Sequence, residues 1–396
     1  MIDRPRYLEW LNRWKDRPVI KVVTGLRRCG KSSVLMLFQE RLLKQGVAAE
    51  NILSINFESL DDDWPREAVA LYRAIVGQLA PGKNYVFLDE VQHVQDFERA
   101  VDALSIREDV DLYITGSNAF FLSGELATLL TGRYVELRML PFSFVELRAA
   151  TPIEVSDDEL LDRYLVYGGL PVVARLSSDQ DISDYLGGVF NTIVMEDARR
   201  RHPRMGMRAF MNTASFIADN IGNITSQKRV SSGLAAGGMS ASPVTVGEHL
   251  DALQENYLVF KAERYDVRGR AYLSTLEKYY LGDLGFRFWL LGKRQGDTGH
   301  RLENAVYLEL LRRYRRVDVG ALSAGEVDFV AQDDAGVQYF QVSLSVLDEN
   351  TFSREMAPLK SIPDNRPKTL LTLDRVGLGD YDGIAHMNVI DWLLER

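Results

Sequence analysis

Short apolar runs recur through the first 140 residues and predict strands that are buried on both faces. The runs lie at 19–24, 85–88, 110–115 and 134–137 and are rich in Val, Ile, Leu and Tyr. Between the first two runs, residues 33–45 carry the apolar spacing of a helix. Apolar strands that alternate with helices are typical of parallel sheets. We therefore predict an α/β domain over residues 1–150, built on a parallel sheet.

The rest of the chain divides into three further parts by the same criterion. Residues 151–225 predict helices, the first of which ends at Tyr167-Gly168-Gly169-Leu170-Pro171. Residues 226–290, whose first helix begins near residue 208, predict helices capped by Ser226 and Thr245, followed by strands at 257–260 and 279–281. That order predicts a winged helix. Residues 296–396 predict a small α/β domain with a helix near Arg301 and strands at 326–330 and 339–343.

A glycine-containing turn separates the first predicted strand from the first predicted helix. Residues 25–32 read Gly-Leu-Arg-Arg-Cys-Gly-Lys-Ser and fit the P-loop pattern G-x-x-x-x-G-K-[ST] at every fixed position. Gly25 and Gly30 allow the tight turn that aims backbone N–H groups at phosphate oxygens, and the helix N-terminus adds a partial positive charge. We expect Lys31 to reach the β- and γ-phosphates of ATP and the Ser32 hydroxyl to bind Mg²⁺.

Two acidic residues follow the second predicted strand and supply what hydrolysis needs. Asp89 and Glu90 end the run Tyr85-Val86-Phe87-Leu88, so they lie at the carboxyl end of a buried strand. Ligands bind at that edge of open α/β sheets. We expect Asp89 to hold Mg²⁺ beside Ser32 and Glu90 to act as the base that orients or deprotonates water.

Polar residues beside the third and fourth strands are further candidates. Ser117 and Asn118 follow the third strand, and Asn118 is the candidate for sensing the γ-phosphate or holding the attacking water. The alternative is turn chemistry, because Gly-Ser-Asn also favours a turn. Arg133 precedes the fourth strand and is a candidate for contacting the γ-phosphate, in cis or from a neighbouring subunit. The alternative is an ordinary surface arginine.

The charge and the cysteine content exclude some classes of protein. The formal net charge of −9 excludes a basic nucleic-acid coat, so any contact with nucleic acid requires a local patch. Cys29 is the single cysteine, which excludes internal disulfides and fits a reducing cytoplasm. Cys29 and Ser33 lie in and beside the P-loop and complete the predicted nucleotide-binding set. No uninterrupted apolar run approaches 18 residues, and we expect no membrane span.

These motifs resemble the AAA-type P-loop ATPases, and in particular a prokaryotic group of uncharacterised predicted ATPases. The similarity includes the opening Arg4-Pro5-Arg6-Tyr7-Leu8, the loop 24–32, Leu88-Asp89-Glu90-Val91-Gln92 and Ile114-Thr115-Gly116-Ser117-Asn118. It continues through Gly132-Arg133 and the Tyr167–Pro171 motif. The resemblance implies ATP and Mg²⁺ as cofactors, a helical lid over 151–225, a winged helix and a restriction-endonuclease-like domain over 296–396.

The last domain has the spacing of a degenerate PD-(D/E)XK nuclease. Glu303, Asp328 and Gln341 match the helix acid, the strand acid and the third metal ligand of that core. The lysine position holds Ser343, which cannot supply the cation that stabilises hydroxide. We therefore expect a weak or dead nuclease. The run Arg312-Arg313-Tyr314-Arg315-Arg316 is either a retained nucleic-acid contact or a solvated helix face.

Two readings of the function remain open. The first is an ATP hydrolase that acts as a switch or remodeller through an unknown protein partner, with self-association as a further expectation. The second is a nucleic-acid-binding ATPase that carries a nuclease domain, using local basic runs such as 196–204. The predicted helix after Thr245 carries Glu248, Asp251 and Glu255 and no Lys or Arg, which argues against its entering a DNA groove.

Overall fold

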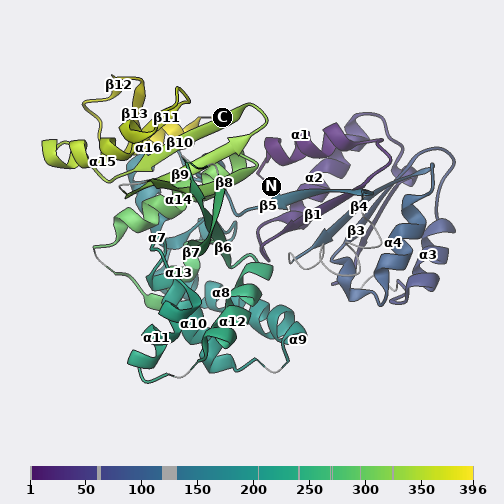
Figure 1. Ribbon diagram of the computed structural model, residues 1–396. Coiled ribbons are helices and arrows are strands. Elements are labelled where there is room, and N and C mark those ends of the chain that lie inside the picture. The colour runs from purple at the N-terminus through teal and green to yellow at the C-terminus, as the bar shows by residue number, and fades with distance from the viewer. Residues whose placement is uncertain are drawn as a thin grey trace. The chain divides into compact units, whose positions relative to one another are not determined.

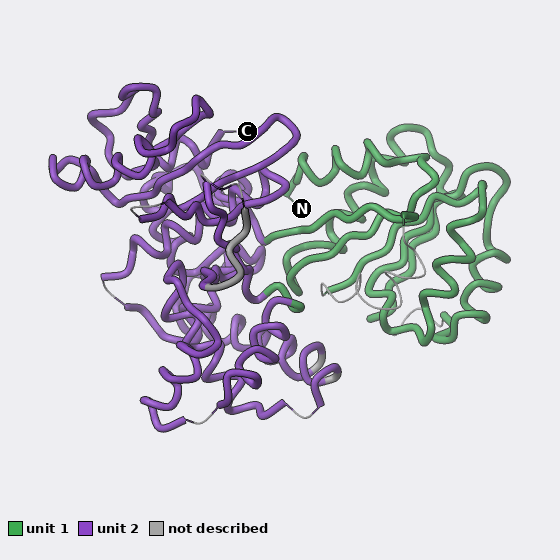
Figure 2. Tube along the Cα trace, viewed as in Figure 1, with its two compact units in different colours: residues 1–140, 255–257 green, residues 141–254, 258–396 purple. Residues whose placement is uncertain are grey.

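The computed structural model describes residues 2–59, 64–117, 132–203, 205–239, 241–267, 269, 271–294, 296–322 and 325–395. The chain forms two compact units (Figure 2). Unit 1 comprises Met1–Leu140 and Glu255–Tyr257, and unit 2 comprises Pro141–Gln254 and Leu258–Arg396. The first unit therefore ends ten residues before the predicted boundary at 150. The three later parts that we separated in the sequence share one unit.

Unit 1 is a parallel sheet with helices on both faces (Figure 1). Its described strands run in the order β2-β3-β4-β1-β5, and every neighbouring pair is parallel. The strands are β1 (Ile20–Gly25), β2 (Ile52–Asn56), β3 (Asn84–Asp89), β4 (Val110–Gly116) and β5 (Tyr134–Met139), and the helices are α1 (Pro5–Trp14), α2 (Lys31–Lys44), α3 (Ala68–Val76), α4 (Phe97–Ser105) and the single turns η1 (Ala49–Asn51) and η2 (Val91–His93). The parallel α/β sheet predicted for this part of the chain is confirmed.

Successive side chains of the central strands point to opposite faces of this sheet and pack against the helices there. Val86 and Leu88 of β3 join the core cluster under α3 and α4. Phe87 points to the other face, where its ring stacks on Tyr113 at 4.7 Å and meets Phe38 of α2 at 6.3 Å. Because both faces are covered, the central strands read as continuous apolar runs.

A buried ion pair interrupts the apolar pattern of the sheet. Lys21 of β1 and Asp111 of β4 are 0% and 1% exposed, and their side chains form a salt bridge. The ammonium also donates to the Arg17 carbonyl oxygen at 2.9 Å. The carboxylate accepts from the Tyr113 hydroxyl and the Asp16 backbone N–H at 2.8 and 2.9 Å. These partners satisfy both charges inside the core.

Unit 2 combines a group of helices with a second sheet. Its helices are α6 (Phe144–Ala150), α7 (Asp157–Tyr167), η4 (Val173–Arg175), α8 (Asp179–Thr192), η5 (Ile193–Ala198, a π-helix), α9 (Arg199–Arg201), α10 (Met207–Asp219), α11 (Gln227–Ala236), α12 (Pro243–Glu255), α13 (Gly285–Leu291), α14 (Thr298–Arg313), α15 (Glu349–Ser361) and α16 (Val389–Leu394). Its strands are β6 (Val259–Asp266), β7 (Ala271–Leu281), β8 (Arg316–Leu322), β9 (Gly325–Asp333), β10 (Gly336–Val342), β11 (Lys368–Thr372), β12 (Gly379–Tyr381) and β13 (Ile384–Asn388). Within the described residues of both units, no helix is long and apolar enough to cross a membrane.

The two predicted wing strands belong to the C-terminal sheet. The described strands of that sheet run β12-β13-β11-β10-β9-β8-β6-β7 (Figure 1). The hairpin β6–β7 pairs through β6 with β8, with Arg264 opposite Val319 and Asp266 opposite Ala321. The two predicted wing strands are present as the antiparallel hairpin β6–β7, but β6 also pairs with β8, so the hairpin joins the sheet of the last domain. The winged-helix assignment stays a prediction.

One of the two predicted helix caps in this unit is confirmed. Ser226 accepts from the Arg229 N–H at the start of α11. Ser156, which was not predicted as a cap, forms a capping box with Glu159 at the start of α7. The prediction of Thr245 as a cap was wrong. The helix α12 begins at Pro243, and the Ser242 hydroxyl accepts from the Thr245 N–H at 3.1 Å.

The Tyr167–Pro171 motif hydrogen-bonds through its backbone to a buried carboxylate in the same unit. Asp283 accepts the N–H groups of Gly169 and Gly285, each at 2.8 Å. Gly168 ends α7 with φ of +75°, and a Cβ there would lie 1.9 Å from the nearer Asp283 oxygen. Only glycine allows the carboxylate this close. The motif thus ties the predicted lid to the segment before α13.

Candidate nucleotide-binding site

The P-loop links β1 to α2 at the carboxyl edge of the sheet. Gly25 has φ of +145°, and a Cβ there would lie 2.2 Å from the Met139 carbonyl oxygen. Gly30 precedes α2 with φ of +104°. Both glycines are therefore required by backbone geometry, as the sequence predicts. The N-terminus of the 14-residue helix α2 points its unpaired N–H groups toward the loop, where an anion is stabilised.

Lys31 lies buried at the first turn of α2. Its ammonium donates to the Gly25 carbonyl oxygen at 3.2 Å and lies 3.5 Å from Glu90 Oε1. The lysine therefore joins the loop to the residue that follows β3. A phosphate in the loop would compete with these oxygens for the same ammonium, which is the position expected for a contact with the β- and γ-phosphates.

Asp89 ends β3 and points to the same place. It hydrogen-bonds to the Ser32 side chain, and its Oδ1 accepts from the Thr115 hydroxyl at 2.6 Å. Burial raises the pKa of Asp89, and the hydrogen bonds from Ser32 and Thr115 oppose that rise. A hydroxyl and a carboxylate in contact form the hard oxygen pair that Mg²⁺ prefers, so Ser32 and Asp89 fit the predicted ion.

Glu90 adopts a left-handed backbone conformation, with φ of 52°. Its N–H donates to Thr115 Oγ1 at 2.8 Å, and its carboxylate accepts from the Gln92 amide. Burial acts to raise the pKa of Glu90, but Lys31 and Gln92 outweigh burial and hold that pKa below its usual value. Glu90 is therefore ionised at neutral pH and able to accept a proton from water.

The end of β4 contributes Thr115 and Ser117. Ser117 is buried, and its hydroxyl accepts from the Gln92 amide at 3.4 Å. Asn118, the candidate γ-phosphate sensor, lies outside the described residues, and its role stays a prediction.

Arg133 is not brought to this site. The residue precedes β5, and its carbonyl oxygen accepts from the Ile20 N–H at the amino end of β1. The P-loop follows the other end of β1. The Arg133 guanidinium is 52% exposed and pairs with Asp102 at 2.5 Å. The expectation of a γ-phosphate contact in cis was therefore wrong, because Arg133 lies at the opposite edge of a parallel sheet.

Two residues position the site although the sequence reading gave them no role. Thr115 hydrogen-bonds to both Asp89 and Glu90. The sequence feature that could have indicated its role was its position directly before Gly116-Ser117-Asn118. Arg4 is buried and donates to the Cys29 and Leu140 carbonyl oxygens, each at 2.9 Å. The only signal for Arg4 was its place in the opening motif. Both act through tertiary contacts that no local pattern reveals.

Cys29 and Ser33 differ in their surroundings. The Cys29 thiol is fully buried and donates weakly to the Met139 carbonyl oxygen at 3.7 Å. Burial raises the pKa of this thiol, so Cys29 acts as a small packing residue of the loop. Ser33 lies on the exposed surface of the first turn of α2. Its contact with nucleotide stays a prediction.

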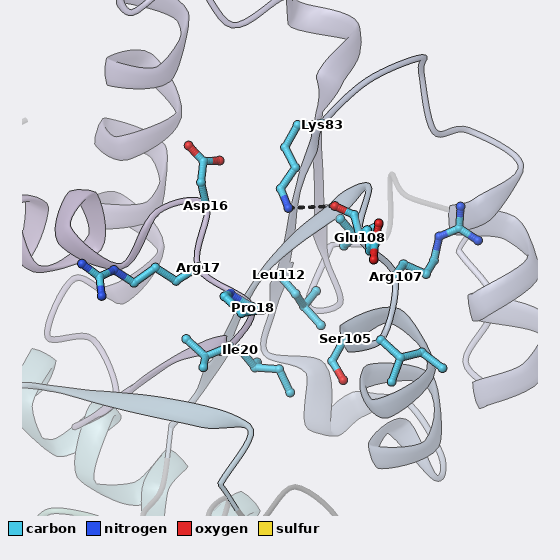
Figure 3. Close-up of a pocket in the computed structure, with 12 residues that line it drawn as sticks. Asp16, Arg17, Pro18, Ile20, Lys83, Ser105, Arg107, Glu108 and Leu112 are labelled. Carbon is cyan, nitrogen blue, oxygen red and sulfur yellow. Dashed lines mark hydrogen bonds between the residues drawn. The ribbon is translucent and has the colours of Figure 1, made fainter.

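A hollow of about 200 Å³ lies at the amino edge of the same sheet (Figure 3). Pro18, Ile20 and Leu112 form its apolar wall, and Lys83 crosses it to donate to the Glu108 carbonyl oxygen at 2.9 Å. None of the predicted nucleotide-binding residues lines this hollow. It is therefore distinct from the P-loop site.

The candidate nuclease residues of unit 2 do converge, but around a lysine. Lys278 of β7 lies 3.2 Å from Glu303 Oε1, 2.8 Å from Glu326 Oε1 and 3.9 Å from Asp328 Oδ1. Gln341 on β10 accepts from the Asp328 N–H at 3.2 Å. Ser343 does not supply the cation of the nuclease pattern, but Lys278 places a cation beside the same acids. Lys278 was missed because it is distant in sequence from these acids and directly precedes a predicted wing strand.

The basic run 312–316 is neither a free patch nor a simple solvated face. Arg312 is buried and donates to the Pro141 carbonyl oxygen at 2.9 Å. Arg313 lies over the Trp392 ring at 4.2 Å and donates to Glu309 at 2.8 Å. Arg315 is exposed. Most of the run therefore serves internal packing.

Comparisons with known proteins agree with this geometry. An AAA domain matches residues 17–148, and a domain of unknown function (DUF8612) matches residues 158–297. An uncharacterised protein of Haemophilus influenzae is 39% identical over 401 residues, which is 100% of this chain and 99% of that protein. The uncharacterised protein MJ1544 of Methanocaldococcus jannaschii is 26% identical over 315 residues, which is 74% of this chain and 67% of that protein.

A solved structure shares the fold. The Walker-type ATPase PABY2304 of Pyrococcus abyssi matches with a TM-score of 0.52 and 16% identity, over 73% of this chain and 96% of that chain. Unit 1 is accordingly an AAA-type P-loop domain with an α/β parallel sheet. The chain belongs to the same family as the uncharacterised Haemophilus influenzae protein, a family that joins an AAA domain to a second unit of unknown function.

Proposed function

We propose that the protein binds ATP with Mg²⁺ at the P-loop and hydrolyses it. The observation that carries the proposal is the convergence of Lys31, Ser32, Asp89 and Glu90 at one edge of the sheet. These four side chains supply a phosphate-binding cation, two metal-binding oxygens and an ionised carboxylate, which is the set that phosphoryl transfer to water requires.

Each side chain has a definite task in this reaction. Lys31 stabilises negative charge on the β- and γ-phosphates. Ser32 and Asp89 would hold Mg²⁺, which neutralises the charge that develops on the phosphate oxygens when it is bound. Glu90 accepts a proton from water, or orients that water in line with the γ-phosphate, and its lowered pKa keeps it ionised for this purpose.

We propose further that ATP turnover drives a switch or remodelling step on a protein partner in the cytoplasm. The overall acidity of the chain and the exposed acids Glu248 and Asp251 on α12 favour protein over nucleic acid. The internal contacts of Arg312 and Arg313 remove part of the support for the nucleic-acid alternative. Self-association, with Arg133 acting in trans, belongs to this proposal.

Calorimetric titration with ATP in the presence of Mg²⁺ tests the binding step. We expect Lys31→Ala to lose binding, because the phosphates lose their main side-chain cation. Lys44→Ala is the matched control, since Lys44 is an exposed lysine at the other end of the same helix. An unmodified protein without measurable affinity for ATP contradicts the proposal.

Turnover of bound ATP tests the chemical step separately. Glu90→Gln keeps the size of the side chain and removes the base, so we expect ATP binding with hydrolysis lowered about 10²–10⁴-fold. Capture of partners from lysate by this variant in the presence of ATP, followed by addition of each partner to the wild-type protein, tests the switch. Stimulation of turnover by DNA or RNA, with none by a captured protein, would favour the alternative.

A further inference from the structure

Three carboxylates of unit 2 face one buried ammonium. Lys278 is 4% exposed, and it is the shared neighbour of Glu303 from α14 and of Glu326 and Asp328 from β9. The helix and the strand are far apart in sequence from β7, which carries the lysine. The ammonium therefore lies where the acidic side chains of two elements, α14 and β9, converge.

Each candidate metal ligand already has at least one oxygen engaged by another group of the protein. Glu303 Oε1 accepts from the Tyr280 hydroxyl at 2.6 Å as well as from Lys278. Asp328 Oδ2 accepts from the Val342 N–H at 2.9 Å. Gln341 uses its carbonyl oxygen for the Asp328 N–H and donates its amide N–H to Glu355 at 2.9 Å. Each candidate ligand thus has a protein partner.

The ammonium occupies the point where the three carboxylates converge. A divalent ion bound by all three would have to take the position that the Lys278 ammonium now holds. Among the residues that the structure describes, no group of three or more Asp, Glu, His or Cys side chains has the arrangement of a metal site.

We infer that Lys278 is the built-in counter-ion of this cluster and takes the place that a divalent metal holds in nucleases of similar spacing. The residues do not fit the metal that the PD-(D/E)XK resemblance implies. The lysine neutralises part of the charge of three carboxylates and holds β7 against α14 and β9. Unit 2 then keeps the framework of a nuclease as a binding or structural module, without metal-dependent cleavage.

Two measurements on the full chain test the inference: titration with Mn²⁺, and thermal unfolding with and without Mn²⁺. All measurements use nucleotide-free protein that carries Asp89→Asn, so that Mn²⁺ at the P-loop does not contribute. Lys278→Met leaves three buried carboxylates without their cation, and we expect Tm to fall by about 6–20 °C. Mn²⁺ at 100-fold above its Kd should restore several degrees of this loss. Lys278→Arg, which keeps the charge, is the matched control.

The Asp89→Asn protein with Lys278 intact should bind no Mn²⁺ in unit 2, and its Tm should not respond to the ion. If that protein binds Mn²⁺ and Asp328→Asn abolishes the binding, the inference is overturned. Cleavage of supercoiled DNA, single-stranded DNA or RNA with Mn²⁺ that Asp328→Ala abolishes would overturn it as well. Should Lys278→Met fail to fold, these measurements on the intact lysine decide the question without it.

Discussion

Thr115 offers the sharpest test of how the nucleotide site is held together. Its hydroxyl donates to Asp89 Oδ1 at 2.6 Å and accepts from the Glu90 N–H at 2.8 Å. Thr115→Val keeps the shape of the side chain and removes both hydrogen bonds. We expect ATP turnover to fall, because the metal-binding acid and the proposed base both lose the group that orients them.

The magnitude follows from the bond to the carboxylate. A hydrogen bond to a charged group contributes about 1.5–3 kcal/mol, and about 1.4 kcal/mol corresponds to a factor of ten, so kcat/KM for MgATP should fall about 10–150-fold. The Thr115 hydroxyl also opposes the rise that burial causes in the pKa of Asp89. Its loss raises that pKa further. If Asp89 must be ionised to hold Mg²⁺, the acid limb of the pH–rate profile moves to higher pH.

Steady-state kinetics over a range of pH and Mg²⁺ concentration measures both effects. Thr115→Ser is the matched control, because serine keeps the hydroxyl and should retain most of the activity. A shift of the acid limb distinguishes positioning of Asp89 from general loss of folded protein, which lowers the rate at every pH. The reasoning is refuted if Thr115→Val matches the wild type in kcat/KM and in its pH profile.

Two other residues of unit 1 give predictions of different kinds. Lys21→Met leaves Asp111 buried without its cation, so urea unfolding should show that the free energy of unfolding falls by about 3–5 kcal/mol. The double variant Lys21→Met/Asp111→Leu should recover part of that loss. A loss below about 1 kcal/mol in Lys21→Met would show that the pair is dispensable. Arg133→Ala removes an exposed ion pair with Asp102 that contributes about 0–1 kcal/mol, and turnover of monomeric protein should not change. In self-associated protein, a fall of about 10³-fold is expected if a neighbouring subunit supplies this arginine, as proposed above, and an unchanged rate there would contradict that role.

The sequence was most informative where function depends on local order along the chain. The P-loop pattern, the acids after β3 and the glycines that require positive φ are local features, and the structure places them as predicted. The edge strand β2 was not predicted, because all but one of its residues are half-exposed or exposed and it carries no continuous apolar run.

Contacts between elements that are distant in sequence could not be predicted from local sequence patterns. Lys278 meets its carboxylates on α14 and β9 only in the folded unit. In the sheet order β6 and β8 lie between β7 and β9, and no spacing rule connects those segments. Arg133 was misplaced for a related reason. Its position next to a strand was read correctly, but which edge of the sheet it occupies depends on strand direction and register.

The pairing of β6 with β8 also determines where this protein can be divided. A fragment that ends near residue 290 keeps the β6–β7 hairpin but loses the strand that covers the free edge of β6. A two-stranded hairpin is marginally stable in water, and an uncovered strand edge recruits strands from other chains. Proteolysis between α13 and α14 would therefore release a fragment prone to aggregation rather than a free DNA-binding module. We therefore expect unit 2 to tolerate insertions in its surface loops better than at the predicted domain boundary near residue 290.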